Sequence, residues 1–166
     1  IVLVSTVLPG ATEGVIKPLL EKESGKKCGV DFGLCYSPEF IALGSVIRDF
    51  TNPDVVLIGE SDQRSGEILS EIYQTVCDNH PPIVRTSIYN GELAKISLNA
   101  FVTMKISFAN TIAEICERIP TGDADVVCKI LGSDSRIGHK YLSGGLSYGG
   151  PCFPRDNKAF AYFAGD

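Results

Sequence analysis

Short apolar runs alternate with amphipathic stretches through the first half of the chain. The runs are four to five residues long and predict strands at residues 1–4, 32–36, 55–59 and 83–86. The run at 55–59 (VVLIG) is apolar at every position, as in strands that a parallel sheet buries on both faces. Helical periodicity predicts helices over 12–23, with Thr12 as the cap and Leu19 and Leu20 facing inward, and over 61–77, with Asp62 near its start.

Alternation of strands and helices predicts a parallel α/β sheet, so residues 1–88 form the C-terminal part of a doubly wound domain. The chain contains no Gly-x-Gly-x-x-Gly turn, so the phosphate-binding first half of such a fold is not located in it. It opens in a strand without an initiator Met. We therefore expect an internal piece of a longer protein.

The pattern changes after residue 88. Neither Gly nor Pro occurs between Gly91 and Pro120, which predicts one helix of about seven turns, on the order of 40 Å long. Its apolar residues occupy nearly every face, and such a helix is buried on most sides. A chain this small hardly surrounds it, so we predict a homodimer through residues 98–115.

Beyond this helix, the sequence predicts a shorter helix over 124–131 and a last helix beginning at Pro154. Between them, residues 132–151 hold six glycines and form a long loop, a length typical of functional or disordered loops. The predicted fold class is thus α/β: residues 1–88 complete a doubly wound domain, and 89–166 form a mostly α-helical central domain around one long helix.

Composition narrows the function classes. A net charge of -5 argues against nucleic-acid binding, and no apolar stretch reaches the roughly 18 residues of a membrane span. Six cysteines without a Cys-x-x-Cys pair, and two histidines, give no metal-ligand spacing. Several cysteines lie in apolar segments, where a thiol packs as a small hydrophobe. We expect free thiols, a cytoplasmic setting and no metal.

Cys152 is the sharpest candidate for chemistry. It directly precedes a predicted helix N-terminus, where backbone N–H groups and the helix dipole stabilise an anion. Glycines on its N-terminal side leave room for a substrate. The alternative is a loop cysteine without a function.

Lys95 and Asn99 are four residues apart on the long helix and hence on one face. A buried ammonium is costly unless it meets a charge partner or a developing negative charge, so the pair is a candidate site for such a charge. The alternative is that Lys95 reaches solvent and Asn99 caps a neighbouring loop.

Glu39 and Thr6 each follow a predicted strand, at the sheet edge where doubly wound folds bind ligands. Their local alternatives are a helix cap and a turn hydroxyl. Arg136 is a candidate anion ligand or a surface arginine. The pairs Gly144-Gly145 and Gly149-Gly150 are a weak phosphate signal, because the P-loop lysine is missing.

In their order along the chain, several motifs resemble the UDP-glucose/GDP-mannose dehydrogenase family. They are STVLPG (5–10), SPEF (37–40), DF (49–50), NPD (52–54), VLIG (56–59), ELAK (92–95), NAF (99–101), KISFAN (105–110), DSRIG (134–138) and YGGPCFPRD (148–156). The resemblance covers essentially the whole chain.

The resemblance implies NAD-dependent, four-electron oxidation of the C6 alcohol of a nucleotide sugar to a carboxylate. Cys152 would be the nucleophile that forms a thiohemiacetal and then a thioester. Lys95 and Asn99 would stabilise the oxyanion. Glu39 would be the acid-base residue of thioester hydrolysis, and Thr6 and Asp156 would hold the attacking water and orient the lysine.

The resemblance also assigns substrate and cofactor contacts. Arg136 would reach the substrate of the partner subunit, with Tyr148, Gly149 and Ser143 on the substrate side. Thr6, Glu39 and Cys152 would also line the NAD site.

Two departures leave the sugar open among UDP-glucose, UDP-N-acetylhexosamine and GDP-mannose. The family often has a second glutamate where Leu43 stands and a lysine near Ser143. We expect the chain by itself to be inactive. One alternative is a non-catalytic helical dimerisation module. Another is a hydroxyacid dehydrogenase with a similar helical domain, against which the GGPCFP run argues, since such enzymes need no cysteine.

Overall fold

The computed structural model describes residues 1–42 and 44–165. The chain divides into two compact units, Ile1–Lys95 and Ile96–Asp166, which are described in turn. Leu43, the position of one departure from the family pattern, lies outside the described residues.

The first unit contains a sheet in the order β1 (Val2–Leu3), β2 (Cys35–Tyr36), β3 (Val56–Glu60) and β4 (Ile83–Ser87). β1 pairs with β2 and β3 with β4 in parallel, but β2 runs antiparallel to β3, with Cys35 opposite Glu60. The predicted parallel sheet is therefore confirmed for the β1–β2 and β3–β4 pairs and wrong for the β2–β3 pair. A parallel crossover needs an element packed across the sheet, and α2 (Val46–Thr51) buries none of its residues. β2 is also shorter than the predicted strand.

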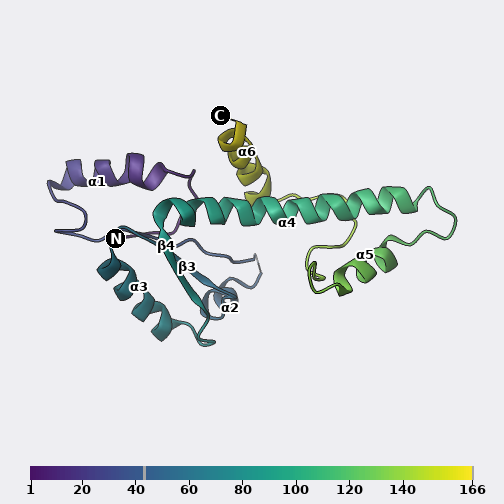
Figure 1. Cartoon of the computed structure of the whole chain (residues 1–166), viewed down its shortest axis with the longest axis horizontal. Helices are drawn as coiled ribbons and strands as arrows, with labels where there is room; N and C mark the ends of the chain where they lie inside the picture. Colours follow the sequence, from purple (N-terminus) through teal and green to yellow (C-terminus); the bar gives the residue numbers. More distant parts are fainter. Residues whose placement is uncertain (43, 166) are drawn as a thin grey trace. The chain divides into compact units, whose positions relative to one another are not determined.

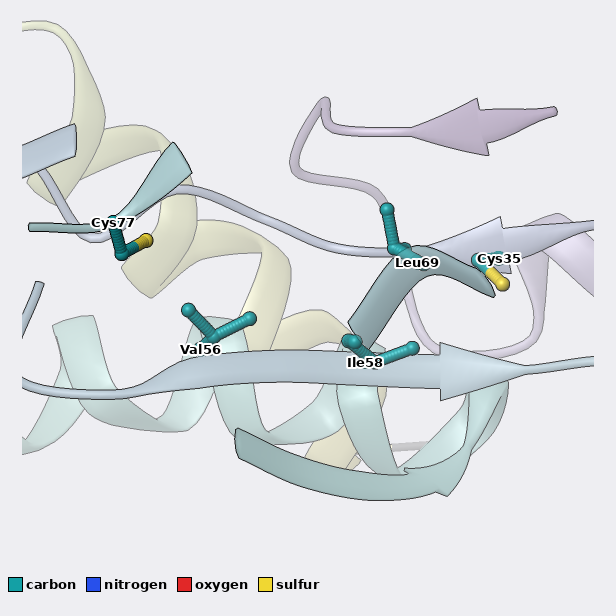
Figure 2. Close-up of a cluster of buried hydrophobic side chains, with 5 residues drawn as sticks. All are labelled: Cys35, Val56, Ile58, Leu69 and Cys77. Carbon is teal, nitrogen blue, oxygen red and sulfur yellow. The ribbon is translucent and has the colours of Figure 1, made fainter. Parts of the chain in front are cut away.

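The sheet has an apolar cluster on each face. Successive strand residues point to opposite faces, so Cys35 lies on one side and Leu34 and Tyr36 on the other. On the first face, Leu69 of α3 (Gln63–Val76) packs with Cys35 and residues of β3 (Figure 2). The second cluster continues with Ile88 and partly buried side chains that include Leu3 and Leu20.

Of the two helices predicted in the first unit, the first starts differently from the prediction and the second starts where it was predicted. A π-helix, η1 (Thr12–Ile16), precedes α1 (Lys17–Ser24). Thr12 is not a cap but a fully buried residue, and the inward-facing prediction fails for Leu19, which is 53% exposed. Asp62 lies at the start of α3 as expected, and it caps the helix by accepting a hydrogen bond from the backbone N–H of Ser65.

The predicted long helix is confirmed as α4 (Ile88–Cys116), 29 residues in one piece (Figure 1). It begins before Gly91, the residue expected to precede it. A Cβ at Gly91 would lie 3.1 Å from the ring of Tyr36 and 3.5 Å from Cα of Gly59. Gly91 thus lets the first turns of the helix approach the sheet backbone. Lys95 ends the first unit, and α4 continues into the second.

In the second unit, α5 (Ala124–Ser133) and α6 (Cys152–Gly165) accompany the rest of α4. The chain leaves α5, returns along α4 and enters α6 (Figure 1). Residues 134–151 form turns and bends, as predicted, and no helix or strand is assigned in them. α6 begins at Cys152 rather than Pro154, so the cysteine lies within the first turn.

The two faces of α4 differ in exposure. One carries buried residues, among them Asn99, Val102, Thr103, Ala109 and Cys116. The other carries large exposed side chains, namely Leu98, Phe101, Met104, Phe108 and Ile115. Within this chain α4 therefore keeps an exposed apolar face, in agreement with the expectation that so small a chain hardly surrounds it. Among the described residues, no helix has the length and hydropathy to cross a membrane.

Candidate active-site residues

Lys95 is held at the carboxyl end of β2. Its Nζ donates a hydrogen bond of 2.5 Å to the carbonyl oxygen of Glu39 and lies 4.7 Å from the centre of the Phe40 ring. The lysine is half-buried, and its ammonium binds a backbone carbonyl rather than solvent alone. Glu39 is also half-buried, and no helix begins there, which removes the helix-cap alternative. The structure brings these two predicted site residues together.

The end of β2 is fixed by a second set of hydrogen bonds. The Ser37 Oγ donates to the carbonyl of Leu57 at 2.9 Å and is hydrogen-bonded to the Tyr73 hydroxyl at 3.0 Å. Burial raises the pKa of Tyr73, so the hydroxyl stays protonated. A small pocket beside these groups is lined in part by Glu39 and Phe40. The backbone that carries Glu39 is therefore well anchored.

Glu92 is a buried residue whose position sequence reasoning missed. Its carboxylate has no exposure and accepts hydrogen bonds from the backbone N–H groups of Gly10 (2.6 Å) and Thr12 (2.9 Å). It therefore replaces the expected Thr12 cap at the start of η1. These partners lie about 80 residues away in sequence, so no local pattern points to them. Glu92 closes the turn that follows Thr6, which is half-buried after β1.

Asn99 and Asp156 are the buried polar pair of the second unit. The Asn99 Nδ2 donates to Asp156 Oδ2 at 2.6 Å, and Arg155 Nε donates to Oδ1 of the same carboxylate at 2.8 Å. The bond to Asp156 raises the pKa of Arg155. Because Asp156 is only 1% exposed, it holds the Asn99 side chain in one orientation, and Asn99 does not cap a loop as the alternative supposed.

Cys152 differs from the other cysteines, all of which lie in the described part of the chain and are free. It is the exposed one, whereas Cys28 is half-buried and the remaining four are buried. Burial raises the pKa of Cys35 to about 11. A Cβ at Gly149 or Gly150 would meet no other described residue within 4 Å, so there is open space on the N-terminal side of Cys152, as expected. The ring of Tyr148 meets Phe153 edge-on, with centroids 6.5 Å apart.

The remaining predicted substrate residues lie on the loop before α6. Arg136 is exposed, and its guanidinium donates to both oxygens of Asp134 at 3.0 and 2.7 Å. This contact raises the pKa of Arg136 and lowers that of Asp134. Ser143 is also exposed. Within the described residues, no three His, Cys, Asp or Glu side chains are placed to hold a metal ion.

Two family models, which belong to one enzyme family, together match nearly the whole chain. Residues 1–77 match the sequence model of the NAD binding domain of the UDP-glucose/GDP-mannose dehydrogenase family, and residues 89–166 match that of its central domain.

Individual relatives agree. The chain is 40% identical to a UDP-glucose 6-dehydrogenase of Haloferax volcanii over 96% of its length and 38% identical to a GDP-mannose 6-dehydrogenase of Pseudomonas putida over 99%. A solved UDP-glucose dehydrogenase of Pyrobaculum islandicum is similar with a TM-score of 0.90 and 38% identity, over 99% of this chain and 36% of that one.

The chain spans 37% of the length of each of these two sequence relatives. Matches to both domain models, together with the shared fold and identity, show that the chain belongs to the UDP-glucose/GDP-mannose dehydrogenase family.

Proposed function

We propose that the whole protein oxidises the C6 alcohol of a nucleotide sugar to the carboxylate, with NAD as the hydride acceptor and Cys152 as the nucleophile. One observation carries this proposal. Cys152 is the exposed cysteine and lies in the first turn of α6, one turn before the buried Asp156 that orients Asn99. The names of the relatives, UDP-glucose and GDP-mannose 6-dehydrogenases, support the reaction class.

The covalent steps follow from a thiol beside an aldehyde. After the first hydride leaves the C6 alcohol, the Cys152 sulfur adds to the aldehyde carbon and forms a thiohemiacetal. Loss of a second hydride leaves a thioester, and water then releases the carboxylate and the free thiol. The Lys95 ammonium and the Asn99 amide would stabilise the oxyanions of these steps. Glu39 and Thr6 would serve hydrolysis, as acid-base residue and water ligand.

The residues present fit one side of an NAD site. Thr6 and Glu39 follow β1 and β2, which are parallel, so their carboxyl ends share the sheet edge where open α/β folds bind ligands. The chain has no Gly-x-Gly-x-x-Gly turn for the pyrophosphate. NAD, when bound, supplies a hydride acceptor; Thr6, Glu39 and Cys152 are the residues we assign to its surroundings. We therefore propose that these 166 residues alone are inactive.

The sugar is left open within the class, among UDP-glucose, UDP-N-acetylhexosamine and GDP-mannose. Ser143 stands where the family often has a substrate-contacting lysine. Tyr148 and Gly149 flank the approach to Cys152 and are assigned to the substrate. The free thiols favour a reducing compartment, and we propose a cytoplasmic enzyme.

A homodimer through α4 is part of the proposal. Its exposed side chains Leu98, Phe101, Met104 and Phe108 recur every three or four residues, which makes one apolar stripe. A second copy would cover the stripe, and Arg136 would then reach the partner's substrate. Light scattering after size exclusion should give a dimer mass, and Phe101→Glu together with Phe108→Glu should give a monomer. A monomeric wild type at micromolar concentration would contradict this.

The reaction is tested on the full-length protein with NAD and, in turn, UDP-glucose, a UDP-N-acetylhexosamine and GDP-mannose. We expect two NADH per sugar and a carboxylate product, and Cys152→Ala should stop carboxylate release while Cys28→Ala does not. Mass spectrometry after a quench should find a sugar adduct on the Cys152 peptide. Normal carboxylate release by Cys152→Ala would overturn the nucleophile assignment. If wild type oxidises none of these three nucleotide sugars, the apolar stripe on α4 favours a non-catalytic dimerisation module instead.

A further inference from the structure

The KISFAN segment of α4 has no part in the chemistry above, although two of its side chains contact the loop before α6. The Lys105 Nζ donates to the carbonyl oxygens of Ile137 (3.1 Å) and Gly138 (3.2 Å). The Asn110 Oδ1 accepts a 2.7 Å hydrogen bond from the backbone N–H of Gly145. Both contacts join residues more than thirty positions apart, so they fix the loop to the helix rather than to itself.

The glycine pair beside Asn110 is shaped for this contact. A Cβ at Gly144 would lie 3.1 Å from Cβ of Ala113, so any other residue would push the loop and α4 apart by a few tenths of an ångström. Gly149 and Gly150, by contrast, have open space around them. The first pair therefore docks the loop on the helix, and the second leaves the cysteine accessible.

The loop also holds unfavourable backbone conformations that need support. Tyr141 and Ser147 have φ angles of 66° and 94°, in the left-handed region that side chains other than glycine seldom adopt. Such conformations persist only when surrounding contacts impose them. The Lys105 contacts precede Tyr141, and the Asn110 contact lies between the two strained residues. They are therefore placed to impose this geometry.

We infer that Lys105 and Asn110 are positioning residues for substrate binding. They clamp residues 137–145 to α4, which sets the course of the chain from Arg136 to Tyr148 and so to Cys152. The inference rests on the proposed function, because the loop is taken as the substrate side of the site. Neither residue touches the reacting atoms in this scheme, so their loss should affect binding more than chemistry.

The experiment compares Asn110→Ala with Asn110→Asp, which keeps an acceptor oxygen, in the full-length protein. Thr111→Ala is the matched control, since Thr111 is exposed and bonds to its own helix at Ser107. Because a net hydrogen bond changes an equilibrium about tenfold, Asn110→Ala should raise KM for UDP-glucose or GDP-mannose about tenfold with kcat within about twofold. Asn110→Asp should restore KM. Lys105→Met should likewise raise KM and leave kcat nearly unchanged, and Lys105→Arg, which keeps a donor, should restore KM.

Amide hydrogen exchange without substrate provides a readout independent of activity. Peptides covering residues 139–150 should exchange about tenfold faster in Asn110→Ala than in wild type or Asn110→Asp, with the rest of α4 unchanged. Exchange and KM equal to those of Thr111→Ala would overturn the clamp, as would faster exchange over the entire protein. If wild type oxidises none of the three nucleotide sugars, the proposed function fails, yet the exchange comparison still decides whether the clamp exists.

Discussion

The two units hold their candidate site residues in different ways. In Ile1–Lys95, Glu39 follows a strand packed between two apolar clusters, and Lys95 binds the backbone there. In Ile96–Asp166, Asn99, Asp156 and the loop before Cys152 are held by side-chain hydrogen bonds along one helix. The first arrangement depends on buried apolar area, and the second on a few directional polar contacts. Substitutions should therefore act on stability in the first unit and on geometry in the second.

Thiol reactivity should show the largest difference between the units. In the native 166-residue chain at pH 8, iodoacetamide should modify Cys152 first and Cys35 at least about a hundredfold more slowly. Cys35 is buried, and its pKa of about 11 leaves little thiolate at that pH. Peptide mass spectrometry over time measures both rates, and guanidinium should make all six cysteines reactive. Equal native rates would contradict the burial of Cys35.

Removing apolar volume from the sheet should cost stability. Ile58 is fully buried in the cluster of Figure 2, so Ile58→Ala should lower the free energy of unfolding by about 2–5 kcal/mol. Urea denaturation measures this, and Ile68→Ala on an exposed position of α3 should change it by less than about 0.5 kcal/mol. The full-length Ile58→Ala enzyme should keep its kcat per folded molecule. A kcat loss of tenfold or more in folded Ile58→Ala enzyme would contradict the claim that substitutions in the first unit act on stability alone.

Removing one polar group from the second unit should instead affect catalysis. Asn99→Ala deletes a proposed oxyanion donor, so kcat in the full-length protein should fall by about 10²-fold with KM little changed. Thr103→Val is the matched control, because Thr103 lies one turn beyond Asn99 on α4 and pairs with Asn157, the residue after Asp156 on α6. It should lower stability by about 1 kcal/mol and spare kcat. An equal kcat loss in both variants would mean that kcat depends on the pairing of the two helices and not on the Asn99 amide.

The smallest expected effect concerns the cap of α3. Hydrogen bonds from Ser65 hold the pKa of Asp62 below its ordinary value, so this carboxylate stabilises the fold at neutral pH. Asp62→Ala should cost about 1 kcal/mol at pH 7 in urea titrations. Because the folded pKa is the lower one, the charge-dependent part is present above about pH 4 and is lost as the pH falls through the folded pKa. Asp62→Asn cannot titrate, so its free energy of unfolding should approach that of wild type as the pH falls through the folded pKa. A difference in unfolding free energy that does not change with pH would contradict this prediction.

Local patterns were sufficient for most elements of the fold. The apolar run VVLIG gave β3, the stretch without glycine or proline gave α4, and Asp62 marked the start of α3. Local patterns failed where a distant partner intervened. Thr12 looked like a cap, but the carboxylate of Glu92 supplies that function from α4. The antiparallel pairing of β2 with β3 likewise joins residues far apart in the sequence, with Cys35 opposite Glu60.

By itself, the sequence determined the family, the long helix and the identity of the candidate residues Thr6, Glu39, Lys95, Asn99, Cys152 and Asp156. These follow from residue type, spacing and order, which the chain carries locally. Only the tertiary structure decided that Lys95 binds the Glu39 carbonyl, that Asp156 orients Asn99, and that Lys105 and Asn110 reach the loop. The reason is physical: a hydrogen bond between residues 32 to 57 positions apart depends on the folded path between them, and no local pattern encodes that path.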